Sequence, residues 1–154
     1  MVNIRQKGQR AEREACDFFN DIYAEVHELI GRPLPPKPIA QRRQNQSAVG
    51  GADIDNTCQY CVEIKNHATL AVNTWWKQTV KSARECNKIP VLMYKIPRAG
   101  WKVVICMNPS VFDINEFNYY IKKEPIRATI ELEDFREIFR AHAINHIVQT
   151  GTYS

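Results

Sequence analysis

The stretch Gly50-Gly51-Ala52-Asp53-Ile54, followed after seven intervening residues by Val62-Glu63-Ile64-Lys65, indicates the fold most directly. The second stretch lies in a run of alternating character that is typical of a β-strand. Because a strand has a period of two residues, Glu63 and Lys65 project from the same face, about 7 Å apart. If a strand at Asp53 pairs with this one, two carboxylates and an ammonium group meet at one edge of a sheet.

This group of side chains suits metal-assisted hydrolysis. Two carboxylates together with water are a typical ligand set for Mg²⁺, for which we expect Mn²⁺ to substitute. A neighbouring lysine can hold or deprotonate the attacking water and can stabilise charge that grows on a phosphoryl oxygen. The alternative is a structural salt bridge, since Glu/Lys pairs are common on exposed strands.

Hydrophobic periodicity and turn signals predict the other elements. The apolar residues of 10–30 fall on one side of a helix, and Gly31 followed by Pro33 predicts its end. Two apolar stretches, 89–96 and 101–107, are joined by residues that predict a hairpin. Further elements are expected as a helix from Asn73 or Thr74 to about Asn87, a short helix opened by Asp113-Ile114-Asn115-Glu116, a strand over 126–132 and a helix over about 133–148. The fold class predicted is α/β, with a mixed central sheet flanked by helices.

Charge is unevenly distributed along the 154 residues, whose net charge is +4. Residues 29–102 carry 12 basic and 4 acidic side chains, a net charge of +8. This suggests a polyanionic partner, most simply nucleic acid, and the alternative is a merely solvated lysine-rich surface. The longest strictly apolar run, 103–107, is far shorter than the ~20 residues that cross a bilayer, so no membrane partner is expected. Five scattered cysteines and no secretory signal favour a reducing, cytoplasmic setting.

Glu12 stands out in the first predicted helix. It lies four residues before Cys16 and seven before Phe19, so it continues an apolar, core-facing stripe. A carboxylate is costly in that position unless something pairs with it, and a metal at the sheet edge would be such a partner. The alternative is that Glu12 simply reaches solvent and favours the helix dipole.

The order of Asp53 and then Glu63-x-Lys65 on the next strand resembles the core of the PD-(D/E)XK nucleases. The segment Lys7-Gly8-Gln9-Arg10-Ala11-Glu12-Arg13-Glu14 resembles the opening of archaeal-type Holliday junction resolvases. Two later stretches, Ile89-Pro90-Val91-Leu92 and Gly100-Trp101-Lys102, are similar to strands of the same enzymes. The resemblance covers roughly residues 7–107 of a single nuclease domain, and the extension over 108–154 has no counterpart in it. The proline-rich segment 31–38 is longer than the corresponding connection in that family.

The resemblance implies a Mg²⁺-dependent DNA endonuclease that resolves four-way junctions as a homodimer. It assigns Glu12, Asp53, Glu63 and Lys65 to the active site, with Asp53, Glu63 and Glu12 as metal ligands, and the wider superfamily adds Gln78. The expected nucleic-acid-binding residues are Arg10, Arg13, Arg42, Arg43, Ser47, Lys77 and Lys81. The dimer surface is expected on the apolar strands of 89–107 and on Phe112, Phe117, Tyr119 and Tyr120.

Other interpretations remain beside this one. The nearest is a different PD-(D/E)XK DNA nuclease, acting in restriction, repair or end-processing, and another is a catalytically silent nuclease fold that only binds DNA. Three local patterns carry less weight. They are zinc binding by Cys58 and Cys61, metal binding by His142 and His146 on one helix face, and base stacking by Trp75 or Trp76.

Overall fold

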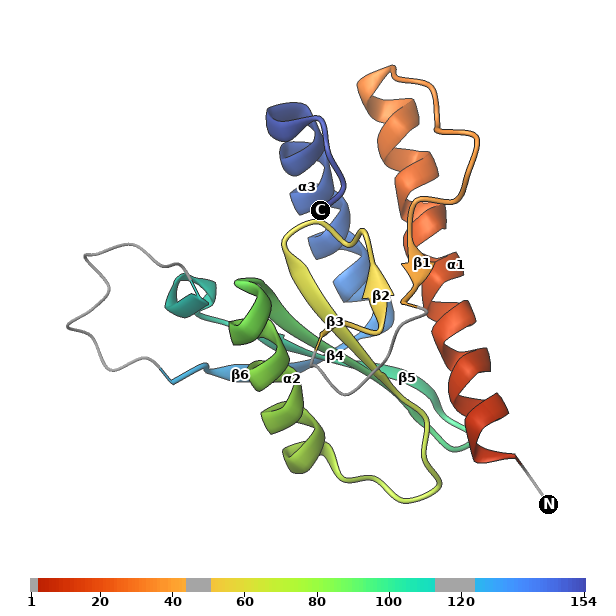
Figure 1. The fold of residues 1–154 in the computed structure, drawn as a ribbon, viewed down its shortest axis with the longest axis vertical. Helices are drawn as coiled ribbons and strands as arrows, with labels where there is room; N and C mark the ends of the chain where they lie inside the picture. The colour runs from red at the N-terminus through yellow and green to blue at the C-terminus, as the bar shows by residue number, and fades with distance from the viewer. Residues whose placement is uncertain (1–2, 44–50, 113–123) are drawn as a thin grey trace.

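A mixed β-sheet forms the centre of the computed structural model, which describes residues 3–43, 51–112 and 124–154. Within these ranges the sheet has six strands in the order β1-β2-β3-β4-β5-β6. Strands β3 and β4 are parallel, and the other neighbours are antiparallel. The elements are α1 (Ile4–Ile30), β1 (Gln41–Arg42), β2 (Ile54–Asp55), β3 (Tyr60–Lys65), α2 (Val72–Cys86), β4 (Ile89–Ile96), β5 (Gly100–Cys106), a 3₁₀ turn (Pro109–Phe112), β6 (Arg127–Glu131) and α3 (Leu132–Thr150), as drawn in Figure 1. The predicted α/β fold is confirmed.

Helix α1 begins six residues earlier than the predicted start at 10. The side chain of Asn3 accepts hydrogen bonds from the backbone N–H groups of Arg5 and Gln6 and so caps the first turn. The predicted end is confirmed, because Gly31 adopts a left-handed conformation with φ of 68° directly after Ile30.

Helix α2 also begins earlier than predicted, since Ala71 occupies the N-cap position and makes no side-chain capping bond. The predicted cap at Asn73 or Thr74 is therefore wrong, and both residues lie in the first turn. The helix ends at Cys86, and Asn87 follows it as the C-cap with a left-handed φ of 55°, so the predicted end at about Asn87 is confirmed. Strand β1 was not predicted, because two residues leave no periodic pattern. The strand expected at Asp53 is β2, which begins one residue later and pairs with β3.

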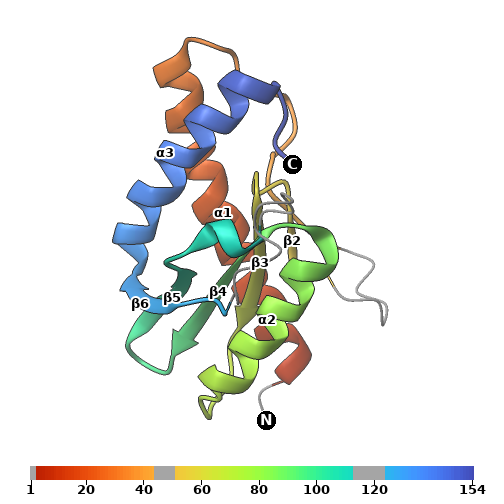
Figure 2. The same cartoon turned by 90° about the vertical axis from the view of Figure 1, so that its left-hand side faces the viewer.

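The helices cover opposite faces of the sheet. Figure 2 shows α1 and α3 on one side and α2 on the other. The alternation along β3 follows this division: Tyr60, Val62 and Ile64 pack in the core beneath α1 and α3, whereas Cys61 packs in the core beneath α2. Glu63 and Lys65 share the face of Cys61 by the period of the strand.

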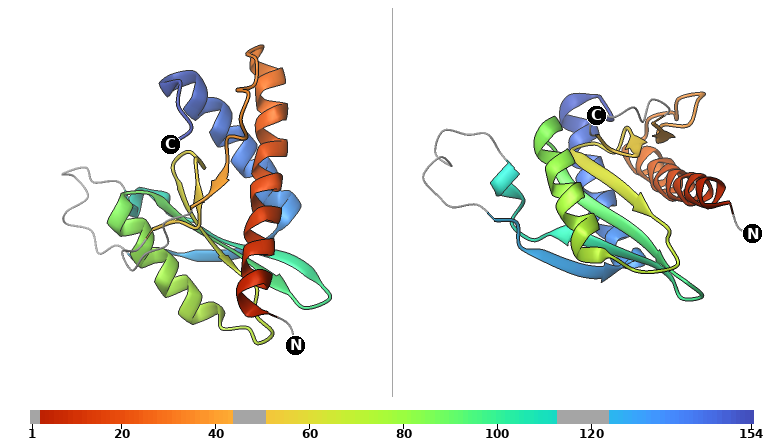
Figure 3. Two further views of the ribbon diagram at one scale, coloured as in Figure 1. Left: turned by 45° about the vertical axis from the view of Figure 1, so that its right-hand side comes forward. Right: turned by 60° about the horizontal axis from the view of Figure 1, so that its bottom comes forward.

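The β4–β5 hairpin was predicted correctly and lies beside the N-terminal half of α1 (Figure 3). There Lys95 Nζ donates to Glu14 Oε2 at 2.8 Å, which joins the hairpin to the helix. This contact holds the start of α1, including Glu12, against the sheet.

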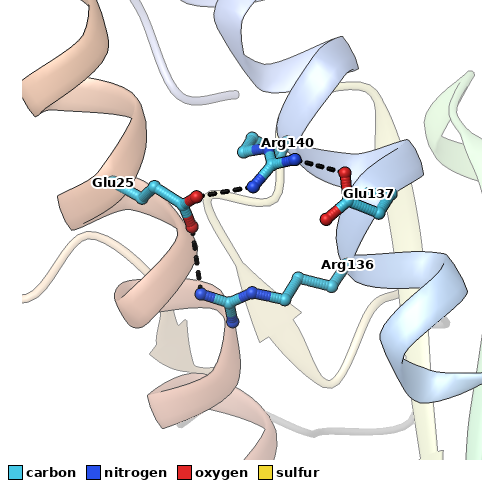
Figure 4. Close-up of polar contacts among 4 residues, drawn as sticks. All are labelled: Glu25, Arg136, Glu137 and Arg140. Atoms are coloured by element: carbon cyan, nitrogen blue, oxygen red, sulfur yellow. Dashed lines mark hydrogen bonds and ion pairs between the residues drawn. The ribbon is translucent and has the colours of Figure 1, made fainter.

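The C-terminal extension completes the sheet and its core. Strand β6 pairs along β5, and α3 packs against α1, where the rings of Phe19 and Phe139 meet edge to face at 4.8 Å. At the rim of this contact Glu25 accepts bonds from Arg136 at 3.1 Å and Arg140 at 2.5 Å (Figure 4). The predicted strand over 126–132 and helix over 133–148 are confirmed, whereas the short helix predicted at 113–116 lies outside the described residues.

Where the structure describes the surface expected to join two copies of the chain, much of it is covered by the chain itself. Val91, Leu92 and Met93 of β4 are at most 1% exposed, and β5 lies between β4 and β6. Phe112 is also buried, at 9% exposed. Phe117, Tyr119 and Tyr120 lie outside the described residues. Within the described ranges, none of the helices combines the length and apolar character that spanning a membrane requires.

Candidate active site

Strand β3 presents an acid and a base to one face of the sheet. Lys65 Nζ lies 3.3 Å from Glu63 Oε1, and the two side chains are only 20% and 14% exposed. The residue between them, Ile64, points into the core beneath α1 and α3 and fixes the strand's orientation. The predicted juxtaposition of Glu63 and Lys65 is confirmed.

Asp53 is held directly beside this pair. Its backbone N–H donates to the Val62 carbonyl at 2.9 Å, immediately before β2 joins the sheet. Its side-chain Oδ2 accepts the backbone N–H of Ile64 at 2.7 Å. Both bonds join Asp53 to β3, so its carboxylate is fixed next to Glu63, as expected if the two segments paired.

Glu12 reaches the same cluster from α1. It is 9% exposed, which excludes the alternative in which it simply points into solvent. Arg42 of β1 donates from Nε to Glu12 Oε2 at 2.7 Å, so the partner that this buried carboxylate requires includes a guanidinium. Arg42 was predicted as a DNA contact, and its bond to Glu12 was not foreseen.

Burial and mutual repulsion disfavour the charged forms of these carboxylates. Burial is the largest cause that raises the pKa of Asp53 to about 7, and the negative charges of Glu63 and Glu12 add to it. Burial also raises the pKa of Glu63, against the opposing effect of Lys65. The negative charge of Glu12 raises the pKa of Glu63 as well as that of Asp53, so the three carboxylates lie close together. A group of carboxylates like this one favours the binding of additional positive charge.

The donor set fits Mg²⁺ with two protein carboxylates. Asp53 and Glu63 supply hard oxygen ligands in a partly buried place, and Mg²⁺ takes one or two carboxylates while keeping several waters. In the described part of the chain, no three His, Cys, Asp or Glu side chains are gathered as a complete metal site. The oxygen of Glu12 nearest to Arg42 is engaged in that ion pair. The three ligand assignments stay predictions.

Arg43 lies next to the aspartate strand. Its backbone N–H donates to the Asp53 carbonyl at 2.9 Å, and its guanidinium lies over Gly51. A Cβ atom at position 51 would collide with Arg43 Nη1, so the glycine leaves room for this side chain. Ser47, the third residue predicted in this segment, lies outside the described residues.

The other predicted contacts are on the surface. Arg10 and Arg13 are exposed on α1 on either side of Glu12, and Lys77 and Lys81 are exposed on α2. Gln78 is also exposed on α2, so the structure does not bury it within the carboxylate cluster. Its catalytic role stays a prediction.

The minor interpretations are not supported by the geometry. Cys58 and Cys61 pack in cores on opposite faces of the sheet, so they do not form a zinc pair. His142 stacks on Tyr60 with an interplanar angle of 2°, whereas His146 Nε2 lies 3.1 Å from the Ser154 carbonyl. Trp75 and Trp76 are each 6% exposed and pack mainly in the core beneath α2, so neither ring stands free on the surface.

Sequence reasoning missed the ion pair between Arg42 and Glu12. The two residues are thirty positions apart, and β1 is too short to show a pattern that would place Arg42 in the sheet. The available signal was the core-facing position of Glu12, which requires a partner but does not identify it.

The mixed sheet, its flanking helices and the Asp53, Glu63 and Lys65 arrangement together define a PD-(D/E)XK nuclease-like protein. Comparison with family models gives the particular family: residues 3–146 match the one described as "Phage putative PDDEXK endonuclease", and the chain belongs to it. Membership of this family indicates a nuclease. A search of curated proteins finds no match to the chain.

Proposed function

We propose that this chain is a Mg²⁺-dependent DNA endonuclease that cuts branched DNA, with four-way junctions as its preferred substrate. The observation that carries the proposal is the bond from Ile64 N–H to Asp53 Oδ2, because it fixes the aspartate beside the Glu63–Lys65 pair. Family membership supports the nuclease activity. The preference for junctions is supported by the resemblance of residues 7–107 to the resolvases.

Each residue of the cluster has a distinct task in this mechanism. When bound, Mg²⁺ supplies positive charge at the scissile phosphate and lowers the pKa of water. Asp53 and Glu63 would hold the ion, and the bond from Ile64 N–H to Asp53 Oδ2 fixes the aspartate for this role. Lys65 Nζ, oriented by Glu63, holds the attacking water or stabilises charge on a phosphoryl oxygen.

Glu12 and Arg42 act as a charged pair at the border of the site. Arg42 orients the Glu12 carboxylate and offsets its charge, which limits repulsion with Asp53 and Glu63. Water attacks the phosphodiester in line, and the products expected from the resemblance carry 5′-phosphate and 3′-hydroxyl ends.

A second candidate is a PD-(D/E)XK DNA endonuclease without a preference for junctions. The burial of β4 and β5 favours it, because the chain itself covers strands that were expected to join the two copies. Junction resolution by paired, symmetric nicks requires two active sites, and one chain contains one proposed site.

The test compares cleavage of a four-way junction, a linear duplex and a single strand by the wild-type chain. Each substrate is incubated with Mg²⁺, with Mn²⁺ and with EDTA. Cleavage that requires the metal and is fastest on the junction supports the proposal. Metal-dependent cleavage at equal rates on junction and duplex favours the second candidate. The absence of metal-dependent cleavage of any substrate contradicts both and leaves a fold that only binds DNA.

A further inference from the structure

A pocket lies between the outer face of α2 and the segment that leads into β6, and we call it the α2–β6 pocket. Its volume is about 830 Å³, which is within the range of small-ligand sites. The described residues that line it do not include Glu12, Asp53, Glu63 or Lys65. The pocket is therefore separate from the candidate active site.

Cationic side chains form the rim of the α2–β6 pocket. Lys77, Lys81 and Arg84 follow one another on α2 at spacings of four and three residues, so they lie along one face of the helix. Arg127 of β6 also lines the pocket. Two acids, Glu85 and Glu124, share the lining, which leaves a net charge of +2 among these six side chains.

Neighbouring side chains hold two of these cations in place. Arg127 Nη2 donates to Asn73 Oδ1, which connects β6 to the first turn of α2 across the pocket. The guanidinium of Arg84 lies 5.8 Å from the centre of the Phe112 ring, in a cation–π contact. The rim is thus partly ordered by contacts of its own rather than formed only by extended, solvated side chains.

The lining also has an apolar part. Trp76, Val80 and Pro125 contribute to it, and Trp76 and Val80 are only 6% and 8% exposed. An apolar floor with a cationic rim matches the chemistry of a nucleotide, whose base and sugar carry apolar faces and whose phosphates are anionic.

We propose that the α2–β6 pocket binds an unpaired nucleotide of the DNA substrate, with its phosphates at the cationic rim and its base or sugar on the apolar floor. The proposal rests on the proposed function and deepens it, since it assigns the recognition of branched DNA to residues outside the active site. In a regular duplex the bases are stacked and paired and cannot enter a side pocket. Nucleotides at a branch point leave the stack at lower cost, so the pocket selects branched DNA over duplex.

The first experiment measures binding of a fluorescent oligothymidylate in EDTA, by anisotropy over a series of salt concentrations. Each phosphate contact to a single strand contributes about −0.7 to the slope of log K against log salt. Lys81→Gln and Arg127→Gln should therefore each flatten the slope by about 0.7. Lys37→Gln removes the same charge from an exposed lysine that does not line the pocket and should leave the slope unchanged. If all three variants have the same slope as the wild type, or if the wild type does not bind the oligothymidylate, the proposal is overturned.

The second experiment tests the requirement for an unpaired nucleotide. A duplex with a single-stranded arm and a blunt duplex of the same length compete for the labelled oligothymidylate. The proposal predicts that the armed duplex competes at least ~10-fold better, a difference that Lys81→Gln combined with Arg127→Gln abolishes. Equal competition by the two duplexes overturns it.

These experiments separate the pocket from the active site, because EDTA prevents metal-dependent chemistry. If the chain cuts DNA with Mg²⁺ but the variants have the same salt slope as the wild type, the proposed function stands and the nucleotide site in the pocket is refuted. If the chain binds DNA as described but does not cut it, the nucleotide site in the pocket stands and the proposed function is refuted.

Discussion

At the scale of single residues, Lys65 is the group whose role is most specific. Its ammonium nitrogen is 3.3 Å from Glu63 Oε1, and the pair lies beside the carboxylate of Asp53. A lysine in this place adds positive charge without being a metal ligand. Its catalytic contribution can therefore be separated from metal binding by substitution.

Lys65→Ala should lower the cleavage rate at least ~100-fold, the scale on which loss of one preorganised electrostatic group acts. Binding of Mn²⁺, followed by calorimetric titration, should persist because Asp53 and Glu63 remain. Lys37→Ala, at an exposed lysine outside the cluster, is the matched control and should cleave at the wild-type rate. Wild-type cleavage by Lys65→Ala would falsify the catalytic role of the lysine.

The pair of Glu12 and Arg42 allows a prediction about stability. Both side chains are partly buried, at 12% and 26% exposed, so removing one partner leaves the other poorly compensated. A double-mutant cycle with Glu12→Gln and Arg42→Gln should show a coupling free energy of about 0.5–3 kcal/mol. Chemical denaturation measures it, and a coupling near zero would mean that Arg42 is not the structural partner of Glu12.

The candidate site was predictable from sequence only in part. The shared face of Glu63 and Lys65 follows from the period of a strand, and Asp53 is near them because few residues separate the two strands. The pairing of Glu12 with Arg42 depends on tertiary packing across thirty residues. Local pattern identifies the need for a partner but not the partner itself.

At the scale of elements, α3 and α1 are joined by Glu25, which accepts from Arg136 and Arg140 (Figure 4). Hydrogen bonding to Arg140 is the largest cause that lowers the pKa of Glu25 below its ordinary value. A carboxyl group with a lowered pKa in the folded state stabilises the fold above its unfolded pKa, and this contribution is lost as the pH falls through the folded value.

Glu25→Gln should therefore lower the free energy of unfolding at neutral pH. The difference from wild type should shrink as the pH falls below the ordinary glutamate pKa of about 4.3 and vanish below the lowered folded value. Urea denaturation at a series of pH values measures the two curves. A difference that is constant over the whole acidic range would contradict the assigned ion pair.

The longer elements were predicted well, whereas of the two short strands only the one beside Asp53 was expected. Helices α1, α2 and α3 and strands β3 to β6 carry periodic apolar patterns, so their existence and approximate bounds follow from the sequence. Strands β1 and β2 have two residues each and leave no such pattern. The early start of α1 depends on Asn3, a capping residue that precedes the region where the apolar pattern begins.

At the scale of the whole molecule, the sequence revealed which strands are apolar but not what covers them. The apolar character of β4 and β5 suggested an interface between copies, yet β6 and the helices bury much of it within one chain. A strand that is buried within one chain and a strand that is buried between two chains have the same apolar pattern in the sequence. The homodimer stays a prediction, which light scattering tests.

The charge distribution gives a prediction for DNA binding. We expect at least about five phosphate contacts on a junction, and at about −0.9 per contact the slope of log K against log salt should be near −4 or steeper. Lys77→Gln, at an exposed position within 29–102, should flatten this slope by about 0.9. Anisotropy with a labelled junction in EDTA measures it. A slope near zero would show that the excess of basic side chains in 29–102 is only a solvated surface.

The central claim is that Asp53 and Glu63 hold the metal for phosphodiester cleavage, and the most direct test measures cleavage by Asp53→Asn and Glu63→Gln. Both substitutions preserve the shape of the side chain and remove its charge. With Mg²⁺, each variant should cleave DNA at least ~100-fold more slowly than the wild type, while binding of DNA in EDTA persists. Cleavage by either variant at close to the wild-type rate would contradict the assigned site.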